Sequence, residues 1–179
     1  MSVAFRSIRC NGLTMRLAEA GSPAAPLVIL AHGWPESWYS WRHQVAPLAE
    51  AGYRVVAPDM RGYGDTDAPA NVEAYDIERL VADMAGIVDE AGREQAVIVG
   101  HDWGAVVAWH AALLRPDRFR AVAALSVPWF GRPPAPPLTI WKQRYGDDFY
   151  YILYHQAPGV AEREYDADPE GLLLKAGCP

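Results

Sequence analysis

The sequence predicts an α/β fold, in which helices flank a mostly parallel sheet. Apolar runs of strand length alternate along the chain with segments whose apolar residues recur at helical spacing. The apolar runs are nearly continuous, which is typical of parallel strands that are buried on both faces. Alternation of strands and helices in this way places helices on both faces of the sheet.

The residues of each segment indicate whether it forms a strand or a helix and where it ends. The start of the chain is expected to add one or two antiparallel strands at an edge of the sheet. The helical segments carry an apolar stripe and end at a glycine or near a proline, as helices commonly do. We therefore expect strands at 27–31, 53–59, 95–100 and 119–127, and helices at 36–51, 76–91 and 104–114.

The composition changes after Phe130, where the proline-rich stretch Gly131–Pro137 (GRPPAPP) begins. Such a stretch is either a ligand for a domain that binds PxxP segments or a stiff hinge, and its position between two parts of the chain favours the hinge. Beyond it, 138–156 and 161–177 are expected to be helical and carry many Trp and Tyr residues. We therefore predict a core over residues 1–130 and an added helical layer over residues 131–179.

Composition and charge exclude several classes of function. The chain of 179 residues has a net charge of −6, and its basic residues are scattered, which argues against nucleic acid or an anionic membrane as a partner. Cys10 and Cys178 lie at opposite ends, so neither a disulfide framework nor a zinc-ligand spacing is present. No apolar run near the start has the length of a signal peptide or membrane span. We expect a soluble, cytoplasmic protein without metal or organic cofactor, and the sequence makes no prediction of its oligomeric state.

The stretch VIVGHDWGAVVAWH places Asp102 where a predicted strand gives way to a predicted helix. In open parallel sheets, ligands bind beyond the carboxyl ends of the strands, which is where Asp102 falls. Asp102 is either an ordinary helix N-cap or an exposed nucleophile on a sharp strand-to-helix turn. An N-cap does not need glycines two residues before and after it, whereas a sharp turn does, so the pattern favours the nucleophile. The elbow would consist of Gly100, His101 and Gly104, with the His101 side chain pointing away from Asp102.

A second motif, AHGWPES, follows the predicted strand at 27–31. Its backbone can turn the Trp34 amide toward the same edge of the sheet as Asp102. The amides of Trp34 and Trp103 would then form a two-donor oxyanion hole for charge that develops on an Asp102 ester. We expect His32 to be a hydrogen-bonding structural residue rather than a base, and the supporting residues of this loop are His32, Gly33 and Pro35.

A third motif, PDMRGYGDTDAP (Pro58–Pro69), is rich in glycine and acidic residues. It is not a phosphate-binding loop, because it lacks the Gly-Lys-Ser/Thr ending of such loops. We interpret it as a scaffold in which Arg61 pairs with a carboxylate.

These three motifs, in this order, resemble those of the α/β-hydrolase superfamily. The aspartate in GHDWGA together with HGWPES is similar to the epoxide hydrolase branch of that superfamily. The stretch FYYILYHQAPGVAEREY resembles the cap segment of soluble epoxide hydrolases that carries one of two cap tyrosines, which corresponds here to Tyr151. The resemblance implies an α/β-hydrolase fold with the first part of a helical cap. It also implies that Asp102 attacks an epoxide carbon and that Tyr151 protonates the leaving oxygen, although Tyr151 could instead only pack among its aromatic neighbours.

The resemblance further implies a second step, in which a histidine and its acidic partner activate water against the Asp102 ester. In the family these residues follow the cap, so we expect this chain to be the N-terminal portion of a longer hydrolase. Of the histidines in the chain, only His155 follows the nucleophile's helix, and it lies on the cap; none fits the role of the base. The five histidines are His32, His43, His101, His110 and His155.

The expected substrate is a small apolar epoxide. Aromatic residues around the expected site favour aryl or alkyl epoxides over polar ones; these residues are Trp34, Trp103, Trp129 and Tyr151. Two alternatives stay open. A haloalkane dehalogenase shares the aspartate nucleophile, although Trp34 stands where that family usually offers an asparagine. A catalytically incomplete, hydrolase-like protein that only binds small apolar ligands is the other.

Overall fold

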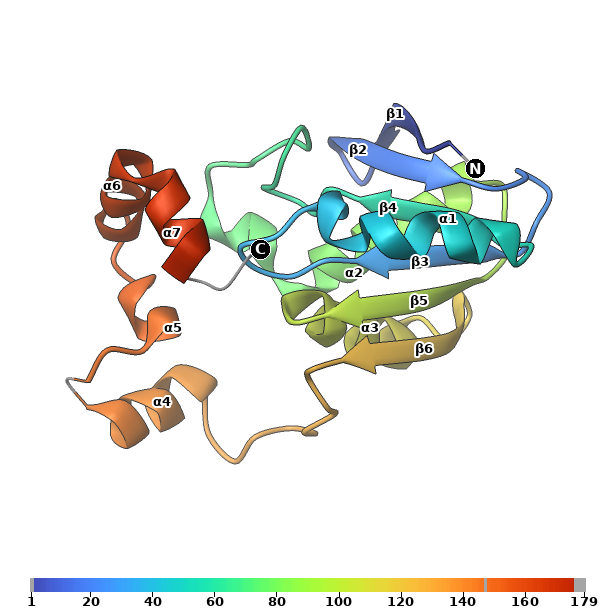
Figure 1. The fold of residues 1–179 in the computed structure, drawn as a ribbon. Helices are drawn as coiled ribbons and strands as arrows, with labels where there is room; N and C mark the ends of the chain where they lie inside the picture. The colour runs from blue at the N-terminus through green and yellow to red at the C-terminus, as the bar shows by residue number, and fades with distance from the viewer. Residues whose placement is uncertain (1, 147, 176–179) are drawn as a thin grey trace. The chain divides into compact units, whose positions relative to one another are not determined.

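The computed structural model describes residues 2–146 and 148–175. The chain folds as two compact units, Met1–Trp129 and Phe130–Pro179. Figure 1 shows the sheet and its helices in the first unit and short helices alone in the second.

The sheet of the first unit has six strands in the order β1-β2-β4-β3-β5-β6. β2 pairs antiparallel with both β1 and β4, whereas the pairs β4–β3, β3–β5 and β5–β6 are parallel (Figure 1). This confirms the predicted parallel sheet with antiparallel strands at its start. The strands are β1 (Ala4–Cys10), β2 (Leu13–Ala20), β3 (Leu27–Ala31), β4 (Arg54–Pro58), β5 (Ala96–His101) and β6 (Phe119–Leu125).

Helices cover both faces of this sheet, as predicted. α1 (Arg42–Glu50) packs through Val45 and Ala49 on one face, whereas α2 (Ile77–Glu90) and α3 (Trp103–Leu114) pack on the other. α2 begins where the sequence predicted. The Asp76 side chain caps it by accepting a hydrogen bond from the Arg79 amide at 2.8 Å. The predicted helix at 36–51 is shorter than expected, since its first turn is a 3₁₀ helix (Trp38–Trp41).

The described part of the second unit contains four short helices rather than the two long ones expected. They are α4 (Pro137–Tyr145), α5 (Tyr151–Tyr154), α6 (Val160–Ala167) and α7 (Pro169–Lys175). α4 ends at Gly146, whose φ of 57° only glycine adopts readily. α6 ends before Pro169, because proline excludes helical geometry at the residue that precedes it. Gly177 and Cys178 lie outside the described residues.

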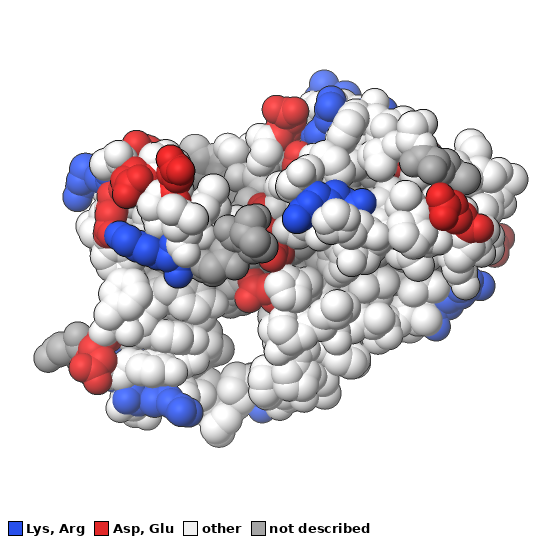
Figure 2. Space-filling view, in the orientation of Figure 1, with Lys and Arg blue, Asp and Glu red and all other residues white. Residues whose placement is uncertain are grey.

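On the face shown in Figure 2, the described lysines and arginines are interspersed with acidic and uncharged residues. Among the described residues, no helix has both the length and the apolar character that crossing a bilayer requires.

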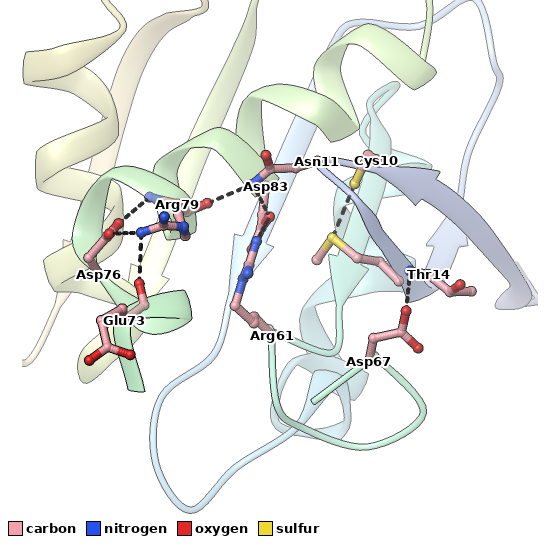
Figure 3. A network of polar contacts seen from close by, with 10 residues as sticks. Cys10, Asn11, Thr14, Arg61, Asp67, Glu73, Asp76, Arg79 and Asp83 are labelled. Atoms are coloured by element: carbon pink, nitrogen blue, oxygen red, sulfur yellow. Dashed lines mark hydrogen bonds and ion pairs between the residues drawn. The ribbon is translucent and has the colours of Figure 1, made fainter. Parts of the chain in front are cut away.

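A buried ion pair joins the loop after β4 to α2 (Figure 3). Arg61 donates to both carboxylate oxygens of Asp83, at 2.8 and 2.7 Å, and both side chains are almost fully buried. The Asn11 side chain donates to the same carboxylate at 2.7 Å. The predicted pairing of Arg61 is thereby confirmed, and hydrogen bonding to Asp83 raises the pKa of Arg61 above its usual range. Three segments that lie far apart in the sequence thus meet at one carboxylate.

His32 joins the ends of two neighbouring strands. The Met60 amide donates to Nε2 at 2.9 Å, so the ring proton of the neutral histidine lies on Nδ1, which faces the Gly33 carbonyl oxygen at 2.8 Å. The side chain is buried, and loss of solvation lowers the pKa of His32 below the usual 6.5.

Replacing Asp83 by Asn should lower the free energy of unfolding by about 3 kcal/mol or more, because it leaves the Arg61 charge buried without its partner. Urea unfolding at pH 7.5 measures this change. Asp117→Asn is the matched control, because it breaks an exposed pair with Arg115 and should change stability little. Equal effects of the two substitutions would contradict the account.

The unfolding free energy should fall as the pH drops below about 6.5, because His32 then takes up a proton more readily in the unfolded chain than in the folded one. This contribution to stability is complete above pH 6.5 and is lost toward the lower pKa of the folded state. Unfolding titrations between pH 7.5 and 5 should show a smaller fall for His32→Gln than for the wild type. The exposed His43, changed to Gln, should leave the wild-type pH dependence intact. A His32→Gln variant with that same dependence would be the contrary result.

Candidate active site

The backbone of Asp102 adopts an unusual conformation between β5 and α3. Its φ is 53° and its ψ is −123°, a region that residues other than glycine rarely occupy. Its side chain makes no capping hydrogen bond to α3, whereas its carbonyl oxygen accepts from the Ala105 amide at 3.0 Å. An ordinary N-cap residue has an extended backbone and a capping side chain. The interpretation of Asp102 as an ordinary N-cap is therefore wrong.

Two glycines allow this conformation by letting backbones touch. A Cβ on Gly100 would lie 2.1 Å from the Gly104 carbonyl oxygen. A Cβ on Gly104 would lie 2.1 Å from the Ala31 carbonyl oxygen, at the end of β3. Both separations are far below van der Waals contact. The main chains of β5, α3 and β3 therefore contact one another directly. This contact explains why glycines occur two residues before and two residues after Asp102.

The loop after β3 lies directly against the Asp102 side chain. The Trp34 amide donates to Asp102 Oδ1 at 3.0 Å. A Cβ on Gly33 would lie 2.4 Å from the same oxygen, so only glycine leaves room for the carboxylate there. The Trp34–Pro35 peptide bond is cis. The structure thus brings Gly33, Trp34 and Asp102 into one site.

Trp103 follows Asp102 as the first residue of α3 and is 40% exposed. The amides of the first helical turn have no partner within the helix, so this amide faces outward from the N-terminus of α3. Its part in an oxyanion hole stays a prediction.

Glu36 is a residue of the site that the sequence analysis did not identify. Its Oε2 accepts from the Gly33 amide at 3.2 Å and contacts His101 Nδ1 at 3.1 Å. One carboxylate thereby connects the loop after β3 to the last residue of β5. The signal in the sequence was a carboxylate three residues after Gly33, within reach of its amide across the turn.

Tyr151 is the first residue of α5 and is half-buried. Its ring packs against those of Tyr150 and His155, with centroids 5.3 and 6.1 Å away. It belongs to the second unit, and its role as the acid stays a prediction.

Trp129 packs against α3, with its ring centroid 6.3 Å from that of Trp109 and 5.7 Å from that of His110. The prediction that it lines a substrate pocket stays a prediction.

Within residues 2–146 and 148–175, histidine, cysteine and acidic side chains form no group of three suited to hold a metal ion.

Comparison with known proteins identifies relatives of this chain. The family described as alpha/beta hydrolase fold matches residues 26–163. Epoxide hydrolase A of Mycobacterium tuberculosis is 57% identical over 164 residues, which cover 92% of this chain and 51% of that protein. Epoxide hydrolase 3 of Siraitia grosvenorii is 46% identical over 170 residues, covering 94% of this chain and 53% of that protein.

A solved structure agrees with these relatives. The crystal structure of epoxide hydrolase A from Mycobacterium thermoresistibile superposes with a TM-score of 0.91 at 54% identity, covering 94% of this chain and 53% of that one. The chain spans about half the length of these curated relatives. The family predicted from the motifs is confirmed: the chain belongs to the alpha/beta hydrolase fold family.

Proposed function

We propose that this protein opens epoxides to vicinal diols through an ester formed on Asp102. The observation that carries the proposal is the Asp102 side chain itself, which is released from capping α3 and instead accepts the Trp34 amide on one oxygen. The similarity to proteins named epoxide hydrolases supports the choice of substrate class.

In the first step, Asp102 Oδ2 attacks a carbon of the epoxide. Oδ1 is occupied by the Trp34 amide at 3.0 Å, which leaves Oδ2 as the attacking atom. A new C–O bond forms while the strained C–O bond of the ring breaks, and its electron pair stays on the leaving oxygen. A carboxylate needs no partner base for this attack. The leaving oxygen takes a proton, and we assign its donation to the Tyr151 hydroxyl.

In the second step, water adds to the ester carbonyl carbon and a base takes one of its protons. The Cγ–Oδ2 bond then breaks, Oδ2 leaves with that proton as a hydroxyl of the diol, and the water oxygen stays on the Asp102 carboxylate. The second proton of the water replaces the one that the acid gave up in the first step. Oδ1 is then the carbonyl oxygen on which negative charge develops, and it already accepts the Trp34 amide. The Trp103 amide at the start of α3 would be the second donor of this oxyanion hole. The two histidines beside the elbow are not assigned as the base, because His32 binds the main chain on both ring nitrogens and His101 contacts Glu36.

The substrate we propose is an apolar aryl or alkyl epoxide. Trp103 follows the nucleophile in the chain, and Trp34 supplies the amide that the nucleophile accepts. The indole rings of both residues offer flat apolar surface. An epoxide with an aromatic substituent can pack against such surface while its ring oxygen faces a hydroxyl donor.

Asp102→Asn should abolish consumption of styrene oxide when protein is in excess over epoxide, because the amide is a far weaker nucleophile. We expect the rate to fall on the order of a thousandfold or more. Chromatography of the remaining epoxide measures the first step whether or not the ester is later hydrolysed. Asp65→Asn, which removes an exposed charge from the loop after β4, is the control and should keep the wild-type rate.

Three outcomes would decide against the proposal. Unchanged epoxide consumption in Asp102→Asn would remove Asp102 from the reaction. Wild-type protein that binds styrene oxide without consuming it would indicate a binding protein. Halide release from 1-chlorobutane without any reaction of the epoxide would indicate a dehalogenase instead.

A further inference from the structure

The turn of helix that carries Tyr151 is too short to be stable by itself. α5 comprises only Tyr151–Tyr154, and an isolated helix of this length is strongly disfavoured in water. The position of the Tyr151 phenol therefore depends on what holds this turn in place.

His155 holds the turn through the Tyr151 main chain. The His155 amide donates to the Tyr151 carbonyl oxygen at 3.0 Å, and His155 Nδ1 lies 2.6 Å from the same oxygen. A carbonyl oxygen only accepts, so Nδ1 carries the proton of the neutral ring. The His155 ring also packs edge to face against the Tyr151 ring.

Tyr165 of α6 engages the other side of the same ring. Its hydroxyl lies 3.0 Å from His155 Nε2. Because Nδ1 is protonated in the neutral ring, Nε2 has a lone pair and the Tyr165 hydroxyl donates to it. α6 is itself anchored, since Glu162 accepts the Gly159 amide at 2.7 Å and Ala161 is buried. A chain of hydrogen bonds thus runs from α6 through one imidazole to the main chain of Tyr151.

A neighbouring contact ties the same two helices without touching Tyr151. The Tyr154 hydroxyl donates to Glu164 Oε2 at 2.5 Å, and this bond raises the pKa of Tyr154. Tyr154 and Glu164 are as far apart in the sequence as His155 and Tyr165, and each lies one position earlier. The chain therefore contains its own control for a simple tether between α5 and α6.

We propose that His155 and Tyr165 are positioning residues, which orient the turn of α5 so that the Tyr151 hydroxyl meets the leaving oxygen of the epoxide. This inference rests on the proposed function. It predicts that breaking the chain of hydrogen bonds impairs proton donation and leaves the nucleophile intact.

The test compares two reagents that alkylate Asp102 and differ in their need for a proton. Opening styrene oxide breaks a C–O bond and requires a proton on the leaving oxygen. Phenacyl bromide alkylates the same carboxylate oxygen while bromide departs with its electron pair, and this reaction requires no proton. Loss of each reagent is measured with protein in excess, for the wild type and for Tyr151→Phe, His155→Phe, His155→Gln, Tyr165→Phe and Tyr154→Phe.

His155→Phe and Tyr165→Phe should slow epoxide consumption on the order of tenfold, in the same direction as Tyr151→Phe, and should leave the phenacyl bromide rate unchanged. His155→Gln should restore most of the epoxide rate. A glutamine amide reaches a carbonyl oxygen four residues back, as Gln156 does to Ile152 at 3.0 Å. Tyr154→Phe should match the wild type with both reagents.

A wild-type epoxide rate in His155→Phe, or equal slowing of both reagents, would overturn the inference while leaving the proposed function in place. An effect of Tyr154→Phe as large as that of Tyr165→Phe would reduce the contact to a tether and overturn it as well. A wild-type protein that reacts with neither reagent would instead overturn the proposed function.

Discussion

The site depends on the close packing of main chains around Asp102. β5 turns into α3 at a residue with positive φ, and the turn fits only because Gly100 and Gly104 lack side chains. This conformation costs on the order of 1–3 kcal/mol and is maintained only where the surrounding structure enforces it. The sheet enforces it, since β5 pairs with β3 along the whole length of β3 and so brings the Trp34 loop to the elbow. The hydrogen bond from the Trp34 amide to Asp102 also depends on this packing, because a Cβ on residue 33 would occupy the space of the carboxylate.

The parts of the structure that the sequence predicted are those in which a local pattern has one physical explanation. Continuous apolar runs predicted the parallel strands, and the glycines around Asp102 predicted the sharp turn. The partner of Arg61 and the role of Glu36 depend on residues that meet only after folding, so no local pattern identified Asp83 or the contact with His101. The helices of the second unit were predicted to be too long, because the predicted ranges ran across Gly146 and Pro169. α4 ends at Gly146, and a new helix begins at Pro169.

The two units differ in how they hold their functional residues. Asp102 is fixed by a six-stranded sheet and buried glycine contacts. Tyr151 lies on a single helical turn, to which the side chains of His155 and Tyr165 add hydrogen bonds. Such bonds contribute roughly 1 kcal/mol each, far less than a packed core. The proposed nucleophile is therefore held rigidly within its unit, whereas the conformation of the turn that carries the proposed acid depends on a few side chains.

The most direct measurement for this account is to locate the covalent intermediate. The protein is mixed with a substoichiometric amount of styrene oxide, quenched in acid within the first turnover and digested for peptide mapping by mass spectrometry. We expect the peptide containing Asp102 to gain the mass of one epoxide, with fragmentation placing it on that side chain. Epoxide consumption with no adduct on Asp102 at any quench time, or with the adduct on another residue, would contradict it.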